Sequence, residues 1–332
     1  MNSTQETGPL WTPLNIFYTV TNVIIFILGV GGNGLVIWIA GFKMKRSVIR
    51  IWYLSLAVSD FLFCAFLPLN VVYMVNNEKI LGVFVWKLMF FSMYFNWFSS
   101  IFLLVIISVD RCVVVMFPVW AQNKRTVTKA SVIVMLAWII SAAYCIPSAI
   151  SLEVQLDDHQ ETKLFFYNYS NNQELTADVT CDFLIGFVIP FLLIVICYVV
   201  IIRKLKPTQM TKSKKPFKIM TALIATFFTC WLPYHIFALM ELNYEKYDLF
   251  LISGSTVALI LANASSCLNP LLYAFMGKDF KRQCYSLLTK IENAIEGEED
   301  KYTLRGTGTT SSGESKLATG NNLNSFASND QL

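Results

Sequence analysis

The chain has 332 residues, of which 55% are hydrophobic and 14% are charged, and its net charge is +4. This apolar content exceeds what the core of one soluble domain buries, so the composition excludes an ordinary water-soluble protein and favours a membrane protein. The weak net charge, and the lack of a phosphate-binding glycine loop or of zinc-type cysteine spacing in the sequence, argue against nucleic-acid, nucleotide and metal chemistry.

Seven apolar stretches follow one another along the chain, each close to the roughly 20 residues that cross about 30 Å of hydrocarbon as a helix. The sequence therefore predicts an all-α fold, an integral membrane bundle of seven transmembrane helices within residues 16–276. The predicted spans are residues 16–41, 48–75, 84–116, 127–150, 179–202, 217–240 and 249–275.

Basic residues gather in the loops after the first, third and fifth spans, whereas acids dominate the alternate loops. By the positive-inside rule the basic loops are cytoplasmic. We therefore expect a plasma-membrane protein with an extracellular N-terminal tail, residues 1–15, and a cytoplasmic C-terminus. The tail shows no cleavable signal peptide. The sequons at Asn2 and Asn168 fall on the outside, where glycosylation occurs.

After the last span, residues 277–289 have the pattern of a short amphipathic eighth helix on the inner leaflet. Cys284 in this segment is either palmitoylated or a plain buried thiol. Residues 290–332 are polar, with few apolar side chains, and are predicted to be a disordered cytoplasmic tail. The tail's Ser/Thr run either takes several phosphates or is a solvated linker.

Polar side chains in the middle of spans are costly in lipid, so each needs a buried partner or a function. One explanation is hydrogen bonding between helices. The other is a buried sodium site, because hard cations prefer oxygen ligands and one carboxylate is accompanied by neutral oxygens. The residues of this predicted site are Asp60, Asn96, Ser100, Ser266 and Asn269.

Two further features suggest a bundle that switches between two states. Asp110 and Arg111 end the third span, where the carboxylate would hold a guanidinium that is later released to a cytoplasmic partner. Prolines in mid-span, Pro190, Pro233 and Pro270, remove amide donors and either serve as hinges or are simply tolerated in lipid.

Seven ordered motifs in these spans resemble the signatures of rhodopsin-like G-protein-coupled receptors, over residues 31–284. They are Gly32-Asn33-Gly34, Leu56-Ala57-Val58-Ser59-Asp60, Asp110-Arg111-Cys112, Trp138, Pro190 with Tyr198, Cys230-Trp231-Leu232-Pro233, and Asn269-Pro270-Leu271-Leu272-Tyr273. The resemblance implies that Trp231 is a rotamer switch under the ligand pocket. It implies a transmission triad of Ile101, Pro190 and Phe227, and a G-protein cleft opened by Arg111, Tyr198 and Tyr273.

Within that family, the runs at residues 117–127 and 214–218 look like those of chemoattractant receptors, such as the chemerin and formyl-peptide receptors and the second prostaglandin D2 receptor. The resemblance implies a peptide, protein or lipid agonist, an inhibitory G protein, and arrestin binding to a phosphorylated tail. A scavenger or decoy receptor that binds ligand without signalling is the alternative. An enzyme is not expected, and an opsin is excluded because residues 249–275 contain no lysine.

The chain departs from the family at two places. Trp86 stands where the family has a disulfide-bonded cysteine, and the loop 152–178 has no cysteine, so we predict no structural disulfide. Asp182 stands where the related receptors carry an arginine, with Asp178 one turn outward, and Tyr94 replaces an acid of formyl-peptide receptors.

These acids form either an acidic upper pocket for a cationic peptide or interfacial carboxylates that face water. Trp231, Tyr234 and His235 complete the predicted ligand site.

Overall fold

The structure, a computed structural model, describes residues 13–76, 83–156, 163–167, 172–204, 214–242 and 248–276, with residues 282, 283, 285, 286, 289 and 293. Seven helical stretches in these ranges are long and apolar enough to cross a membrane. The predicted seven-helix bundle is therefore confirmed. The predicted glycosylation sites Asn2 and Asn168, the thiol of Cys284 and the tail 290–332, apart from residue 293, lie outside the described residues.

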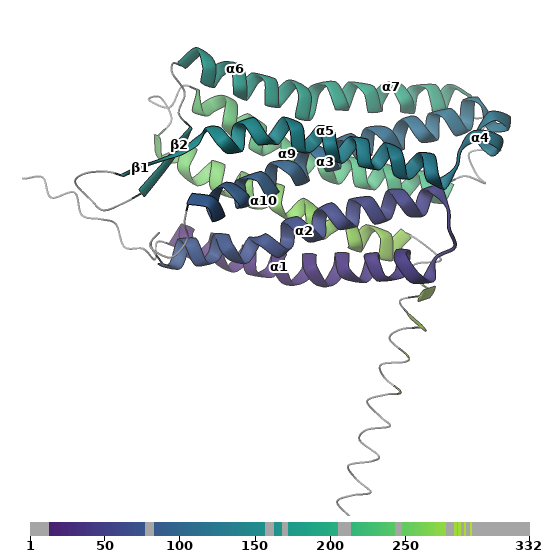
Figure 1. Ribbon diagram of the computed structural model, residues 1–332, viewed down its shortest axis with the longest axis horizontal. Coiled ribbons are helices and arrows are strands. Elements are labelled where there is room, and N and C mark those ends of the chain that lie inside the picture. The colour runs from purple at the N-terminus through teal and green to yellow at the C-terminus, as the bar shows by residue number, and fades with distance from the viewer. Residues whose placement is uncertain are drawn as a thin grey trace, which may run out of the picture. The chain divides into compact units, whose positions relative to one another are not determined.

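The helices follow one another along the chain (Figure 1). They are α1 (Pro13–Trp38), α2 (Val48–Asn76), α3 (Val83–Met116), α4 (Pro118–Lys124), α5 (Val127–Ser151), α6 (Asn172–Phe183), α7 (Ile189–Lys204), α9 (Lys214–Glu241) and α10 (Asp248–Met276). Two π-helical turns interrupt the pattern, η1 (Ile39–Lys43) after α1 and η2 (Leu184–Val188) between α6 and α7. The fifth span is therefore longer than predicted, because its helix begins at Asn172.

A two-stranded antiparallel hairpin, which the sequence did not predict, joins α5 to α6. It pairs β1 (Leu152–Leu156) with β2 (Lys163–Tyr167), and Leu152 lies opposite Tyr167. Each strand is only five residues long, too short for its alternation to stand out between two long apolar spans.

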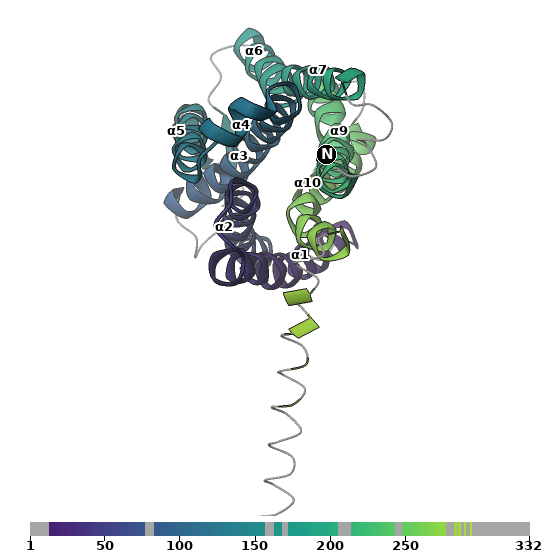
Figure 2. The same cartoon turned by 90° about the vertical axis from the view of Figure 1, so that its right-hand side faces the viewer.

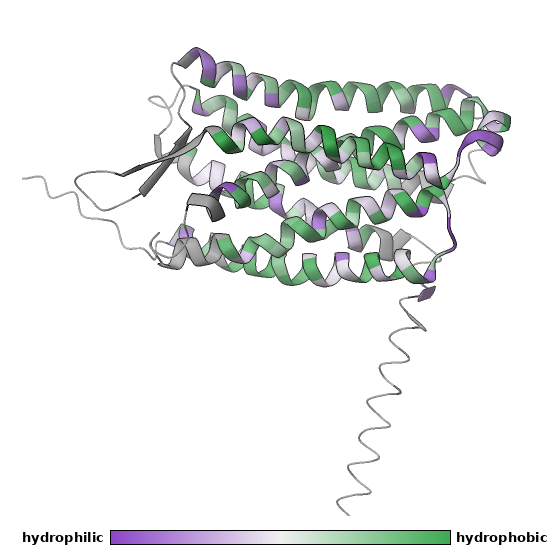
Figure 3. Cartoon of the chain, viewed as in Figure 1, coloured by the Kyte–Doolittle hydropathy of each residue, from purple (hydrophilic) through white to green (hydrophobic). Residues whose placement is uncertain are grey.

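Apolar side chains cover the outside of the bundle as well as its inside. Figure 3 shows hydrophobic residues along the middle of the helices and hydrophilic residues near their ends. On α5, for example, Ile139 is 59% exposed and Ile140 is 57% exposed. In a bilayer these side chains face lipid, and the helical backbone satisfies its own hydrogen bonds, as a spanning segment must.

Local signals mark where several helices begin. The backbone N–H of Arg50 donates to Oγ of Ser47 at 3.3 Å, and that of Lys129 donates to Oγ1 of Thr126 at 3.3 Å, so both hydroxyls cap the first turn of a helix. Pro118 occupies the first turn of α4, where a missing amide donor costs nothing.

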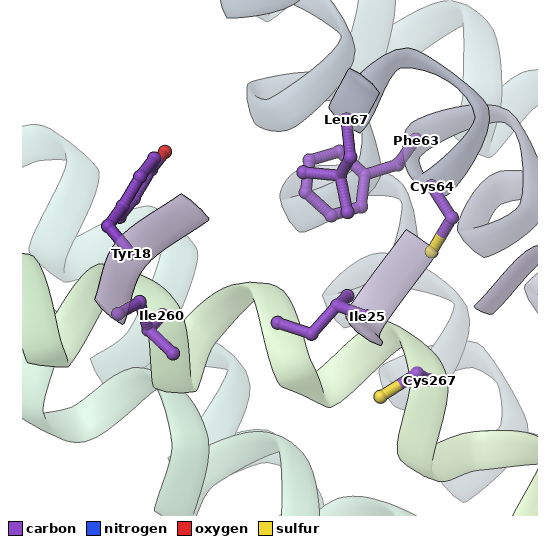
Figure 4. Packing of buried hydrophobic residues seen from close by; sticks show 7 residues of the cluster. All are labelled: Tyr18, Ile25, Phe63, Cys64, Leu67, Ile260 and Cys267. Carbon is purple, nitrogen blue, oxygen red and sulfur yellow. The ribbon is translucent and has the colours of Figure 1, made fainter. Parts of the chain in front are cut away.

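Close packing joins α1, α2 and α10 on one side of the bundle, where Figure 4 shows a cluster of buried side chains. The cluster consists of Tyr18, Ile25, Phe63, Cys64, Leu67, Ile260 and Cys267. Gly29 of α1 makes this contact possible, because a Cβ at that position would overlap the thiol of Cys64. Viewed end-on in Figure 2, the helices form a ring, and α3 packs against α2, α5 and α7.

Candidate functional site

The most polar part of the bundle surrounds Asp60, which is 1% exposed in the middle of α2. Asn96 of α3 donates from Nδ2 to Oδ1 of Asp60 at 3.0 Å, and Asn269 of α10 donates from Nδ2 to Oδ2 at 2.7 Å. Ser266 of α10 donates in turn to Oδ1 of Asn96 at 3.0 Å. Four of the five residues of the predicted cluster therefore form one hydrogen-bonded network that joins three helices.

A cavity of about 10 Å³ lies beside this network, lined among others by Asp60, Asn96, Ser100, Trp231 and Asn269. It has room for about one water-sized sphere. The buried hydroxyl of Ser100 makes no hydrogen bond to any residue that the structure describes. A carboxylate, an uncommitted hydroxyl and amide oxygens are the ligand types that hard cations take, so these residues fit a single small cation.

Next to this cavity, aromatic side chains gather around Trp97 of α3, which is 1% exposed. The indole of Trp97 stacks on Trp231 with ring centroids 5.0 Å apart and 13° between the planes. Its centroid lies 5.0 Å from His235, 6.0 Å from Tyr234 and 5.6 Å from Tyr94. We call these five residues the aromatic cluster. Four of them were predicted ligand-site residues, whereas Trp97, the residue at the centre, was missed.

Several polar atoms of the aromatic cluster are buried without a hydrogen-bond partner among the described residues. They are Nε1 of Trp97, Nε1 of Trp231 and Nε2 of His235. Because buried polar groups are normally paired, three orphans in one cluster are groups that an incoming polar ligand or water would satisfy.

The close contact between α3 and the fifth span depends on Gly186 in η2. A Cβ on Gly186 would overlap the indole ring of Trp97. In the same turn the N–H of Ile189 donates to the carbonyl of Leu184, five residues back, directly before Pro190. The fifth span is thus irregular directly before Pro190, in the form of a π-helical turn that the sequence did not predict.

Asp182 of α6 lies at the interface with α5, where its Oδ1 accepts a hydrogen bond from the hydroxyl of Tyr144 at 3.0 Å. The Tyr144 ring packs on Phe98 of α3 with centroids 4.4 Å apart. Both Asp182 and Asp178 are partly buried. Sequence reasoning missed Tyr144, although a phenol inside an apolar span was a signal for a buried partner.

At the α4 end of the bundle, Asp110 accepts two short hydrogen bonds from Arg125. Nε of Arg125 donates to Oδ1 at 2.6 Å and Nη2 donates to Oδ2 at 2.8 Å. Trp52 of α2 also donates from Nε1 to Oδ2, at 3.3 Å. The predicted contact with Arg111 exists, but its Nη2 stands 3.6 Å from Oδ2. Bidentate pairing makes Arg125, for which the sequence predicted no contact with Asp110, the principal partner of Asp110.

Arg111 itself keeps unused donors. Its Nε and Nη2 are buried and make no hydrogen bond within the described part of the chain. Nearby, Thr221 of α9 donates to the hydroxyl of Tyr198 of α7 at 3.3 Å. Tyr273 belongs to α10, but its side chain lies outside the described residues.

The other predicted switch residues lie between the two ends. Ile101 of α3 is 0% exposed, Phe227 of α9 is 5% exposed, and Pro190 of α7 is buried. The ring of Phe227 stacks near Trp231 with centroids 5.8 Å apart, which links this layer to the aromatic cluster. Pro233 and Pro270 lie inside α9 and α10.

Two sequence features, the cysteines and Trp86, concern the prediction that no structural disulfide holds the outer loop. Seven cysteines of the described residues, Cys181 among them, are free thiols. The side chain of Trp86, at the place of the family's cysteine, lies outside the described residues.

The amino-acid sequence matches the family model of the 7 transmembrane receptor (rhodopsin family) over residues 32–273. It is 39% identical to Chemerin-like receptor 1 of Homo sapiens over 299 residues, 84% of this chain and 80% of that protein. It is 39% identical over 306 residues to N-formyl peptide receptor 2 of Homo sapiens, covering 86% and 87% of the two chains.

A third relative, the C3a anaphylatoxin chemotactic receptor of Oncorhynchus mykiss, is 37% identical over 304 residues, 89% of this chain and 82% of that protein. Together with the seven apolar spans, these matches make the chain a multi-pass plasma-membrane protein. The chain belongs to the rhodopsin family of seven-transmembrane receptors, in the branch that contains the chemoattractant receptors.

Proposed function

We propose that this receptor binds an extracellular chemoattractant, a peptide, small protein or lipid mediator, and activates a cytoplasmic G protein of the inhibitory class. The observation that carries the proposal is that the buried Nε and Nη2 donors of Arg111, near the α4 end of the bundle, make no hydrogen bond to any described residue. Buried Arg donors without hydrogen bonds are available to a partner that docks at that end. At the other end, the aromatic cluster offers unpaired polar atoms to a ligand.

The charges at the two ends support the proposed orientation. Five basic residues lie at the junction of α1 with α2 and at the junction of α4 with α5: Lys43, Lys45, Arg46, Lys124 and Arg125. This basic end therefore faces the cytoplasm, and the N-terminus is extracellular. The C-terminal tail follows on the cytoplasmic side, where phosphates on its Ser/Thr run would provide an acidic surface for arrestin.

Nucleotide exchange on a purified inhibitory G protein tests the signalling half of the proposal. The full-length receptor in lipid nanodiscs should accelerate exchange when basic peptides or chemerin fragments that bind it are added. Arg111→Ala should abolish the acceleration and leave peptide binding intact. Peptide binding without any acceleration by the unmodified receptor would instead identify a scavenger or decoy.

The ligand half of the proposal concerns the charge of the agonist. Asp182 and Asp178 are acids at partly buried positions, so the site favours a ligand with an amine or guanidinium group over one with a free carboxylate. Asp182→Asn and Asp182→Ala should each weaken the binding of a basic peptide at least tenfold, on the order expected when a buried charge loses its partner.

Glu174→Gln is the matched control, because Glu174 is an exposed acid on the same helix. The ligand hypothesis is wrong if the peptide binds the Asp182 variants as tightly as it binds the control.

We also infer that the cavity beside Asp60 holds sodium. The carboxylate, the Asn96 amide oxygen and the uncommitted Ser100 hydroxyl would bind the ion, which would supply the positive charge that the buried carboxylate lacks. Because an ion that binds only the folded state stabilises it, replacing choline chloride by sodium chloride at equal ionic strength should raise the thermal midpoint. The rise should vanish in Asp60→Asn, and an equal rise in that variant would contradict the site.

A further inference from the structure

Two neighbouring hollows open on the lipid-facing side of α3 and α5. One, of about 430 Å³, is lined only by apolar residues, including Ile140, Pro190 and Leu193. The other, of about 340 Å³, extends toward the α4 end and includes Trp120. The hollows share Val105, Ile106 and Ile133 in their lining, so they lie next to each other, and we call the two together the α3–α5 groove.

The length of the groove matches one leaflet of a bilayer. On α5 the lining runs from Lys129 to Ile140. At 1.5 Å per residue this separation corresponds to roughly 16 Å, about half of the ~30 Å hydrocarbon thickness. A long apolar chain that starts at the membrane surface would therefore fill the groove and end near the bilayer midplane.

The surface end of the groove is cationic. Lys124, Arg125 and Lys129 all line the hollow at the α4 end. Arg125 is committed to Asp110, whereas Lys124 and Lys129 are exposed and form no ion pair with another described residue. Trp120 lies one turn before Lys124 on α4 and is 53% exposed, as is typical of an indole at the membrane interface.

We propose that the α3–α5 groove binds an anionic phospholipid of the cytoplasmic leaflet, with an acyl chain along Ile106 and Ile133 and the phosphate at Lys124 and Lys129. The two parts of such a lipid match the two parts of the groove, because an apolar hollow in the hydrocarbon takes a chain and basic side chains at the surface take an anionic headgroup. The proposal rests on the proposed function in one respect, because that function places the α4 end in the cytoplasm.

The proposed lipid site also lies against the ion pair between Arg125 and Asp110. Arg125 lines the groove and donates to Asp110, so a bound phosphate adds a second acceptor within reach of the same guanidinium. Binding of the lipid would thereby weaken the hold of Arg125 on Asp110. The composition of the inner leaflet would then bias the ionic contacts next to Arg111.

Native mass spectrometry of the full-length purified protein tests the proposal without agonist or G protein. The protein in neutral detergent is titrated with phosphatidylserine and, separately, with phosphatidylcholine that carries the same acyl chains. Phosphatidylserine should be retained preferentially. The double variant Lys124→Gln/Lys129→Gln should weaken its binding roughly 25-fold, since each basic residue near the surface contributes about a fivefold factor.

Lys45→Gln/Arg46→Gln is the matched control, because these exposed cations lie at the same end of the bundle but do not line the groove. It should leave binding unchanged. Ile133→Trp should weaken the retention of phosphatidylserine by filling the groove, and the 41% exposure of Ile133 makes this change compatible with folding.

Equal retention of phosphatidylcholine, an equal loss in the control variant, or full binding by Ile133→Trp would each overturn the proposal. A receptor that retains phosphatidylserine but never activates a G protein would refute the proposed signalling and leave the lipid site intact.

Discussion

Removing Arg125 should expose how strongly it is coupled to Asp110. Arg125→Gln deletes the two hydrogen bonds of 2.6 and 2.8 Å and leaves Asp110 with Trp52 at 3.3 Å and Arg111 at 3.6 Å. The side chains of Arg125 and Asp110 are 22% and 11% exposed, between a surface pair and a buried pair. Exposed pairs contribute up to about 1 kcal/mol, and breaking a buried pair costs about 3–5 kcal/mol. We therefore expect a coupling free energy of about 2 kcal/mol.

A double-mutant cycle isolates that coupling. The free energy of unfolding is measured in mixed micelles for the unmodified receptor, Arg125→Gln, Asp110→Asn and the double variant. Lys124→Gln is the control, because this exposed neighbour has no ion pair with a described residue, and its effect should stay within about 0.5 kcal/mol. A coupling free energy below about 0.5 kcal/mol would refute the conclusion that Arg125 is the principal partner of Asp110.

Three further predictions concern packing, buried polarity and topology. Gly186→Ala should displace the indole of Trp97 and lower the free energy of unfolding by about 1–3 kcal/mol. Combining it with Trp97→Phe should recover part of that loss, because the smaller ring leaves room for the new methyl group. If nothing is recovered, the strain does not arise from the contact with Trp97. Asn33→Ala, which removes the donor to the carbonyl of Ser266 at 2.9 Å, should cost about 1 kcal/mol in the same assay, and an unchanged free energy would mean that this bond contributes nothing. Glycosidase treatment should shift the mobility of the unmodified receptor, and replacing Asn2 and Asn168 by Gln should abolish that shift. The absence of any shift in the unmodified receptor expressed in cells that glycosylate would contradict the extracellular placement of both sequons.

The positions of the spans could be read from the sequence because spanning a bilayer is a local property. A stretch of about 20 apolar residues suffices, whatever the rest of the chain does. The predicted start at residue 48 agrees with α2, and the predicted end at residue 116 agrees with α3. The start of the fifth span was less visible, because residues 172–178 are polar although the helix already runs through them.

The residues of the candidate sites also differ in how well the sequence reveals them. The sequence identified the buried polar residues one by one, since polarity in an apolar span is conspicuous wherever it occurs. Asp60, Asn96, Ser266 and Asn269 were therefore found before their hydrogen bonds were known. Apolar and aromatic residues are common in such spans, so nothing in the sequence distinguished Trp97 from other buried rings.

Only the tertiary structure decided which side chains meet. Tyr144 reaches Asp182, Arg125 reaches Asp110, and Trp97 lies on Trp231, although each pair comes from different helices or from a helix and a connecting segment. Successive side chains point about 100° apart around a helix axis. Which side chains meet between two helices therefore depends on how each helix is rotated about its axis and how far it is shifted along it. The apolar composition of the sequence determined that this chain spans a membrane. The packing of the helices determined which partners its few buried polar side chains contact.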